Sequence, residues 1–288
     1  MSSSRVNSRG VSAKQAIALS LPSIHPSQPQ TAAFQETGTG TPLLMLHGFM
    51  GSAACWVPLM ATLSSEMRCV ALDLLGFGDS AKPRMRYNIA QEVAFVREFV
   101  QAQNLGACYL LGHSFGGWVA AAYAIAHPDL VKGVILAAPA GIRDDSFCGR
   151  YDHLRPILWE TPVVDWILTA IAPVLNRTNQ RDTLKKIRWM RQELMAQPAA
   201  RSFLMDRLRP EDAIDTVECE IHRIQAPTLV ITGDRDDTIP LWHCETYAHR
   251  IPNAKLVILP DADHSLPRDY APQLATHIQS FLATHALV

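Results

Sequence analysis

The chain reads Cys108-Tyr109-Leu110-Leu111-Gly112-His113-Ser114-Phe115-Gly116-Gly117 where a short apolar run meets the pattern G-x-S-x-G. The run from Cys108 to Leu111 has the length and composition of a buried strand, and Gly116 to His127 has a helical pattern that ends at Pro128. A serine at such a strand-to-helix turn adopts strained dihedral angles, and the flanking glycines avoid clashes of Cβ atoms. The pattern therefore predicts a hydroxyl presented on a sharp turn at Ser114.

Short apolar runs alternate with helical patterns on both sides of this stretch. The helical pattern that precedes it has Ile89, Val93, Val96 and Val100 on one face, and the last helix opens near Pro272. Strands that alternate with helices predict an α/β fold with a mostly parallel sheet, and Thr31–Glu36 is a candidate for an earlier strand. The predicted buried strands are Leu43–Leu46, Cys69–Leu72, Cys108–Leu111, Val134–Ala137, Thr228–Ile231 and Leu256–Leu259.

Two segments depart from this alternation. Residues 143–222 contain no clear strand run and have helix-like spacing, so we expect a helical insertion between two strands. Residues 1–30 contain arginines and serines but no acidic residue, which is typical of a disordered tail or of an organelle transit peptide. We therefore expect a tail over 1–30, a core formed by 31–142 and 223–288, and a helical insertion over 143–222.

Composition excludes several classes of protein. The chain has 288 residues, of which 48% are hydrophobic and 18% charged, so most of it is expected to fold around a packed core. Its 26 basic and 27 acidic residues argue against a nucleic-acid binder, and no apolar stretch predicts a transmembrane helix. The six cysteines include no C-x-x-C pair, so no metal site is expected. A reduced, cytoplasmic protein is the simplest expectation, with an organelle as the alternative if residues 1–30 are a transit peptide.

A serine hydroxyl needs an adjacent base, and the base needs a group that orients it. Both are expected further along the chain, in the order Ser, Asp, His. The loop after Thr228–Ile231 offers Asp234, Asp236 and Asp237, which the residues alone do not separate. His264 follows the last predicted strand, so it would reach the same edge of the sheet as Ser114.

These motifs, taken in order, resemble the α/β-hydrolase family. In that family the loop after this strand often reads G-x-x-D-x-x-x-P, which Gly233, Asp236 and Pro240 match. The resemblance therefore implies Asp236 as the acid and His264, 28 residues later, as the base. Four other aspartates are interpreted as turn-forming or exposed, namely Asp234, Asp237, Asp261 and Asp263. The resemblance also implies an eight-stranded core and a cap formed by residues 143–222.

The same resemblance assigns an oxyanion hole. One backbone N–H follows the nucleophile, at Phe115, and the second is expected at Phe49 in the loop His47-Gly48-Phe49-Met50-Gly51-Ser52. His47 is interpreted as a structural hydrogen-bonding residue rather than a base. Asp73 is interpreted as a local hydrogen-bond acceptor in a structural loop.

The chemistry that these residues imply is acyl transfer to water. Ser114 would attack the carbonyl of an ester, thioester or lactone, and water would resolve the acyl-enzyme without a metal or organic cofactor. A C–C bond hydrolase or lyase acting on a diketone-like substrate is the main alternative, since the Leu46–Ser52 loop and the Gly116-Gly117 pair resemble such enzymes, including the menaquinone-pathway lyase type. Acyl transfer, cofactor-free haloperoxidase activity and a slow-turnover ligand receptor are further alternatives. A serine at the turn argues against dehalogenases and epoxide hydrolases, which need an aspartate there.

The expected partner is a small molecule, apolar or anionic. Nine basic and three acidic residues lie between Arg177 and Arg209, which is typical of a solvated helix face, an anionic-substrate site or a membrane-facing surface. Trp159, Trp166 and Trp189 in the insertion are candidate substrate contacts, although such residues more often pack. The sequence carries no signal for an oligomeric state.

Overall fold

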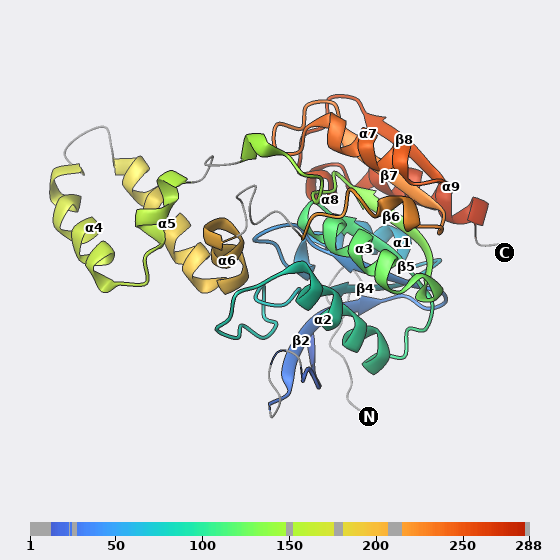
Figure 1. Cartoon of the computed structure of the whole chain (residues 1–288), viewed down its shortest axis with the longest axis horizontal. Helices are drawn as coiled ribbons and strands as arrows, with labels where there is room; N and C mark the ends of the chain where they lie inside the picture. Colours follow the sequence, from blue (N-terminus) through green and yellow to red (C-terminus); the bar gives the residue numbers. More distant parts are fainter. Residues whose placement is uncertain are drawn as a thin grey trace.

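An eight-stranded sheet forms the centre of the computed structural model, which describes residues 13–22, 24, 28–147, 152–175, 181–206 and 215–285 (Figure 1). The strand order is β1-β2-β4-β3-β5-β6-β7-β8. The two pairings that involve β2 are antiparallel and all others are parallel, which confirms the expected α/β-hydrolase fold. The strands are β1 (Gln15–Leu19), β2 (Gln30–Thr37), β3 (Pro42–Leu46), β4 (Arg68–Leu72), β5 (Cys108–His113), β6 (Val131–Ala137), β7 (Thr228–Gly233) and β8 (Ala254–Leu259).

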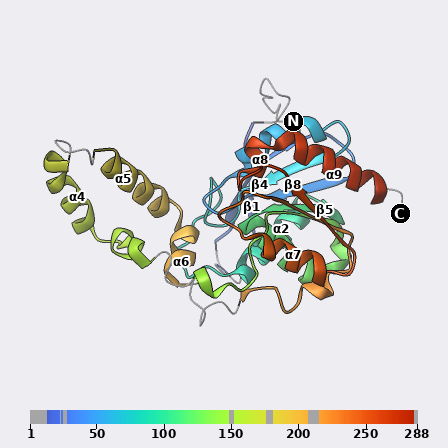
Figure 2. The same ribbon diagram turned by 90° about the horizontal axis from the view of Figure 1, so that it is seen from above.

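Helices cover both faces of the sheet, because successive side chains of a strand point to opposite faces. Leu44 and Leu46 of β3 belong to the core on one face, whereas Leu43 and Met45 belong to the core on the other. Figure 2 shows α2 and α7 on one side of the sheet and α8 and α9 on the other. The α-helices are α1 (Val57–Leu63), α2 (Ile89–Ala102), α3 (Phe115–Ala126), α4 (Pro162–Leu175), α5 (Arg181–Ala196), α6 (Pro198–Asp206), α7 (Leu241–Arg250), α8 (Leu266–Asp269) and α9 (Ala271–His285). Short 3-10 helices are η1 (Ala53–Trp56), η2 (Pro128–Leu130), η3 (Asp145–Phe147), η4 (Asp152–Leu158) and η6 (Ile221–Arg223).

Helix α2 illustrates how the local sequence sets an element. Asn88 precedes the helix, and its side chain accepts a hydrogen bond from the N–H of Gln91 while the Gln91 side chain accepts one from the N–H of Asn88. This reciprocal cap satisfies two N–H groups that a helix start leaves without partners. The four apolar residues that predicted the helix are all buried, so the periodicity identified the face that packs against the sheet.

The first strand lies where the sequence predicts a tail. Strand β1 pairs with β2, and β2 itself confirms the strand expected at Thr31–Glu36. Lys14, just before β1, lies 2.6 Å from Asp73 Oδ2 and 2.6 Å from Asp79 Oδ2. The expected tail over residues 1–30 is therefore wrong for the segment that forms β1, while residues 1–12, 23 and 25–27 lie outside the described residues.

The insertion between β6 and β7 contains only helices, turns and irregular segments in its described part. Helices α4 and α5 are tied by Arg191, whose Nε and Nη2 each lie 2.8 Å from a carboxylate oxygen of Asp165. Helix α6 connects this hairpin to the core, since Ser202 Oγ accepts a hydrogen bond from the N–H of Tyr87 at 3.0 Å. Figures 1 and 2 show α4 and α5 standing away from the sheet, with α6 between. Across the described ranges, every helix is too short or too polar to cross a bilayer.

Candidate active site

Ser114 lies at the turn between β5 and α3, with φ of 52° and ψ of −115°. A positive φ is costly for a residue with a side chain, and the surrounding structure maintains it here through close backbone packing. A Cβ atom at Gly112 would lie 2.2 Å from the carbonyl oxygen of Gly116, and one at Gly116 would lie 2.2 Å from that of Leu46. The two glycines of the motif are thus required by the close approach of strand and helix.

The three residues expected to form a triad converge at this turn. His264 Nε2 lies 3.1 Å from Ser114 Oγ, so the hydroxyl donates to the ring, and His264 Nδ1 lies 2.8 Å from Asp236 Oδ2 and donates to it. The other oxygen of Asp236 accepts the N–H groups of Thr238 and Ile239, both at 2.9 Å. Burial raises the pKa of Asp236, but His264 and these two amides outweigh it, so the net pKa lies below the usual value.

Only one of the three aspartates in this loop reaches His264 in the structure. The Asp236 side chain is 2% exposed, whereas Asp234 and Asp237 are exposed. Beyond β8, Asp263 accepts a hydrogen bond from the N–H of Ser265, and Asp261 forms an ion pair with Arg235. These contacts agree with the interpretation of the neighbouring aspartates as turn or surface residues.

The two expected oxyanion donors lie beside Ser114. A Cβ atom at Gly48 would lie 3.3 Å from the Cβ of Ser114, so the loop that carries Phe49 is packed directly against the serine. Among the described residues, no backbone carbonyl accepts a hydrogen bond from the N–H of Phe49 or Phe115. Both N–H groups therefore lack a backbone acceptor in this part of the structure, as the donors of an oxyanion hole would.

His47 and Asp73 have the structural contacts expected of them. His47 is fully buried, its Nδ1 donates to the carbonyl of Gly48 at 2.8 Å, and its Nε2 accepts from the N–H of Leu74 at 3.0 Å. Asp73 is also fully buried and accepts from the N–H of Ala53 at 2.6 Å and from that of Asp79 at 2.7 Å. These contacts hold the loop that carries Phe49 in place.

His113 contacts the backbone of His264, and the sequence did not predict this contact. Its Nε2 donates to the carbonyl oxygen of His264 at 2.8 Å, and the two rings lie 4.8 Å apart between their centroids. Burial and the neighbouring His264 lower the pKa of His113 to about 3, so the ring is neutral and remains a donor. The only feature of the sequence that could have indicated this contact is the presence of a histidine inside the G-x-S-x-G pattern. Whether that histidine supports His264 depends on which backbone atom its ring faces in the folded chain.

Acid is expected to reduce the stability that His113 contributes. Because its pKa is about 3 in the folded protein and 6.5 in the reference state, the unfolded chain binds a proton between these values that the folded protein does not. The free energy of unfolding should therefore fall as pH drops below about 6.5, with a slope from this residue of up to about 1.4 kcal/mol per pH unit. His113→Asn should be less stable than the wild type at neutral pH, and the difference should shrink on acidification.

Urea unfolding of both proteins from neutral pH downward measures this difference. The exposed His249→Asn variant on α7 is the matched control. A difference between wild type and His113→Asn that is the same at every pH would contradict the expected neutral, buried state of His113.

An apolar cavity of about 330 Å³ opens at Ser114. It is lined by the loop that carries Phe49, by the start of α3 and by side chains of α5 and α6. Trp159, Trp166 and Trp189 do not line it and are exposed, so the structure does not bring these three candidates to the serine. The lining residues are Phe49, Met50, Ser114, Phe115, Trp118, Ala140, Leu154, Met190, Leu194, Phe203, Leu204 and Thr238.

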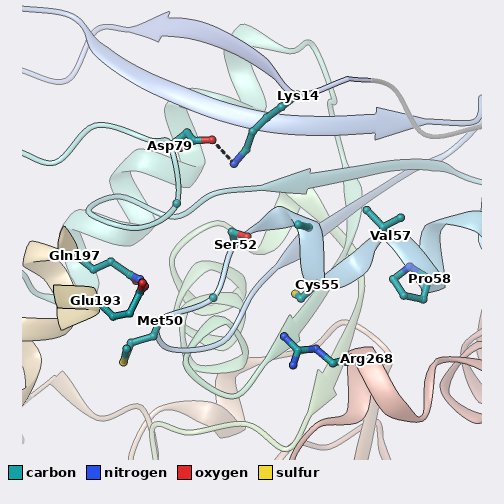
Figure 3. Close-up of a pocket in the computed structure, with 13 residues that line it drawn as sticks. Lys14, Met50, Ser52, Cys55, Val57, Pro58, Asp79, Glu193, Gln197 and Arg268 are labelled. Carbon is teal, nitrogen blue, oxygen red and sulfur yellow. Dashed lines mark hydrogen bonds and ion pairs between the residues drawn. The ribbon is translucent and has the colours of Figure 1, made fainter. Parts of the chain in front are cut away.

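A second, more polar cavity of about 780 Å³ also has Met50 in its lining (Figure 3). Figure 3 shows Lys14 paired with Asp79 at one edge and Arg268 pointing toward Cys55 at the other. Burial raises the pKa of Cys55 to about 12, so this thiol is not a nucleophile near neutral pH. Met50 lines both cavities.

Two further expectations concern charges and metals. Within the described ranges, no cluster of three or more His, Cys, Asp or Glu side chains could hold a metal ion. Of the nine basic residues between Arg177 and Arg209, for which three interpretations were open, Arg177, Arg207, Arg209 and the side chain of Arg181 lie outside what the structure describes. Arg191 is buried on Asp165 rather than free for an anionic ligand.

The chain is similar to known hydrolases in sequence and in structure. Residues 43–276 match the model of the alpha/beta hydrolase family. The chain is 30% identical over 260 residues to a 2-hydroxymuconate semialdehyde hydrolase of Pseudomonas sp. (strain CF600), covering 86% of this chain and 89% of that protein. A thermophilic esterase from Thermogutta terrifontis is similar in structure, with a TM-score of 0.73, 25% identity and coverage of 94% and 99% of the two chains. The meta-cleavage product hydrolase CumD from Pseudomonas fluorescens IP01 is similar in fold, with a TM-score of 0.70, 20% identity and coverage of 93% and 97%.

Proposed function

The chain belongs to the alpha/beta hydrolase family, and we propose that it is a serine hydrolase that cleaves a carboxylic ester, thioester or lactone. The observation that carries this proposal is the continuous hydrogen-bond relay from Ser114 Oγ through His264 to Asp236. A serine in such a relay, at a strained turn beside two N–H groups that lack a backbone acceptor, has the parts that acyl transfer needs.

The reaction would proceed in two halves. In the first, His264 Nε2 takes the proton from Ser114 as Oγ bonds to the carbonyl carbon, and the N–H groups of Phe49 and Phe115 stabilise the oxyanion. The imidazolium, which Asp236 orients and stabilises, then gives this proton to the leaving alcohol or thiol. In the second half, water attacks the acyl-enzyme with His264 again as base, and the acid and the free serine are released.

The lining of the 330 Å³ cavity supports a neutral, apolar acyl group as the part of the substrate next to Ser114. Among its lining residues there is no Lys, Arg, Asp or Glu, and Thr238 and Ser114 are the polar ones. A charged acyl group would lose its hydration there without gaining a partner. We also propose that the insertion acts as a cap that shields the reaction from water, since Met190 and Leu194 of α5 line the cavity.

A C–C bond hydrolase is the second candidate, and the 30% identity to a 2-hydroxymuconate semialdehyde hydrolase favours it. Another relative, 24% identical over 258 residues, is named for a hexa-2,4-dienoic acid, which carries a carboxylate. Such a carboxylate would need a cation, and Arg268 lines the second cavity rather than the cavity at Ser114. The lining at Ser114 therefore favours the ester.

Steady-state kinetics on matched substrates separates these candidates. We expect kcat/KM for a neutral medium-chain p-nitrophenyl ester to exceed that for a 2-hydroxy-6-oxohexa-2,4-dienoate by more than about tenfold, which corresponds to a difference of about 1.4 kcal/mol in activation free energy. The reverse preference would assign C–C bond cleavage. Turnover of neither substrate by a protein whose Ser114 reacts with a fluorophosphonate would instead favour a ligand receptor built on this fold.

A further inference from the structure

Helix α4 exposes an apolar face that nothing in the described structure covers. Val163, Trp166, Ile167, Ala170 and Ile171 are exposed, and their spacing of three and four residues places them on one side of the helix. In a globular protein such a stripe normally faces the core, and contiguous exposed apolar patches mark interaction surfaces. The half-buried Val164, Leu168 and Ala172 lie on a neighbouring side, so α4 uses a different face to pack against α5.

The exposed charges of the neighbouring helix α5 are mostly basic, since Asp182 is the one exposed acidic residue of that helix and it pairs with Lys185. The only acidic residue of α4, Asp165, is held by Arg191. Along α5, Lys185, Lys186 and Arg188 are exposed, and in the described part of the chain neither Lys186 nor Arg188 forms an ion pair. Trp189 is exposed among them, and Trp159 is exposed just before α4.

We propose that the hairpin of α4 and α5 docks the protein on an anionic lipid surface, with the exposed face of α4 in the headgroup region. Tryptophan prefers the interface between lipid and water, and each lysine or arginine near an anionic bilayer adds attraction. Helix α4 has 14 residues and spans about 21 Å, which is shorter than the hydrocarbon core, so it would lie in the plane of the interface. The position of the hairpin away from the sheet leaves it free to reach a surface (Figures 1 and 2).

A second copy of the chain is the other occupant that the apolar face could accept. Lysine is depleted at protein interfaces, whereas lysine and arginine beside tryptophan are typical of helices that bind lipid headgroups, so the composition favours lipid. Docking would also place α5, whose Met190 and Leu194 line the cavity at Ser114, next to the lipid. The inference does not rest on the proposed reaction, because it uses none of the residues of the relay.

Co-sedimentation with vesicles of phosphatidylcholine, with and without phosphatidylglycerol, tests the proposal. We expect binding that requires phosphatidylglycerol and that falls about tenfold or more in Trp166→Gln/Ile167→Gln. The matched control is Trp242→Gln/Ile258→Gln on α7 and β8, since these side chains are 43% and 44% exposed against 67% and 54% for Trp166 and Ile167. The rate of fluorophosphonate labelling checks that each variant is folded.

A charge variant provides a second arm that leaves the apolar face intact. Lys185→Glu/Lys186→Glu should weaken binding to phosphatidylglycerol vesicles about tenfold or more, whereas Lys132→Glu/Lys255→Glu, on exposed sites of β6 and β8, should weaken it less. Absence of vesicle binding by the wild type, or equal binding by all four variants, would overturn the proposal. A lipid-free dimer that Trp166→Gln/Ile167→Gln converts to a monomer would assign the face to a second copy instead.

Discussion

Ser114→Ala is expected to lower kcat for ester hydrolysis by about 10,000-fold or more and to leave the free energy of unfolding within about 1 kcal/mol. The hydroxyl is the atom that His264 Nε2 faces at 3.1 Å, so its removal leaves the base with no nucleophile to activate. The oxyanion donors and the cavity remain, and residual catalysis would come from them. Intact mass after fluorophosphonate treatment gives an independent readout, since the wild type should gain one label and the variant none.

Combining the Ser114→Ala and His264→Ala substitutions tests whether the two residues act together. If Ser114 and His264 act as one unit, His264→Ala should cost about as much as Ser114→Ala, and the double variant should be no slower than either. Ser65→Ala, at an exposed serine remote from the relay, is the matched control. Stoichiometric labelling of Ser114→Ala would place the reactive group elsewhere and refute the assignment of the nucleophile.

The residues of the relay could be located from the sequence because each follows a buried strand. Ser114, Asp236 and His264 lie in the turns that follow β5, β7 and β8, and the carboxyl ends of parallel strands meet at one edge of the sheet. Chain position therefore placed them near one another before any contact was known. The residues alone did not separate Asp236 from Asp234 and Asp237, because all three lie within one turn, and the choice came from the family resemblance.

The first strand could not be predicted in the same way. Strand β1 pairs along one edge only, and its side chains are alternately half-buried and exposed until Leu19, so its sequence lacks the continuous apolar run of a central strand. Its anchor is the ion pair between Lys14 and the buried Asp73, which are 59 positions apart. No local sequence pattern predicts an ion pair between residues so far apart in the chain. The serine-rich N-terminal segment was therefore interpreted as a tail.

The insertion shows what periodicity does not determine. Spacing identifies which residues share one helix face, but not what that face meets. The prominent tryptophans were therefore the natural candidates for substrate contacts, whereas Met190, Leu194 and Phe203 line the cavity instead. Which residues reach Ser114 depends on how α5 and α6 pack on the core, and this packing rests on long-range contacts such as that between Ser202 and Tyr87.

Asp236→Asn is expected to lower kcat by about 1,000- to 10,000-fold with little change in KM. The amide oxygen can still accept the N–H groups of Thr238 and Ile239, so the loop should keep its geometry. The amide nitrogen would instead face His264 Nδ1 as a donor and favour the tautomer that carries its proton on Nε2. A ring protonated at Nε2 cannot take the proton of Ser114, and the imidazolium would lose the carboxylate that stabilises it.

The neighbouring aspartates make this prediction a test of the acid itself. Asp237→Asn and Asp234→Asn change charge and size identically in the same loop, but their side chains are exposed and lie outside the relay, so each should cost less than about threefold. Because the pKa of Asp236 lies below its usual value, the carboxylate of the wild type stays ionised through mildly acidic pH, and the contrast should hold across that range. Equal losses in Asp236→Asn and Asp237→Asn would mean that loop charge, rather than orientation of His264, supports turnover.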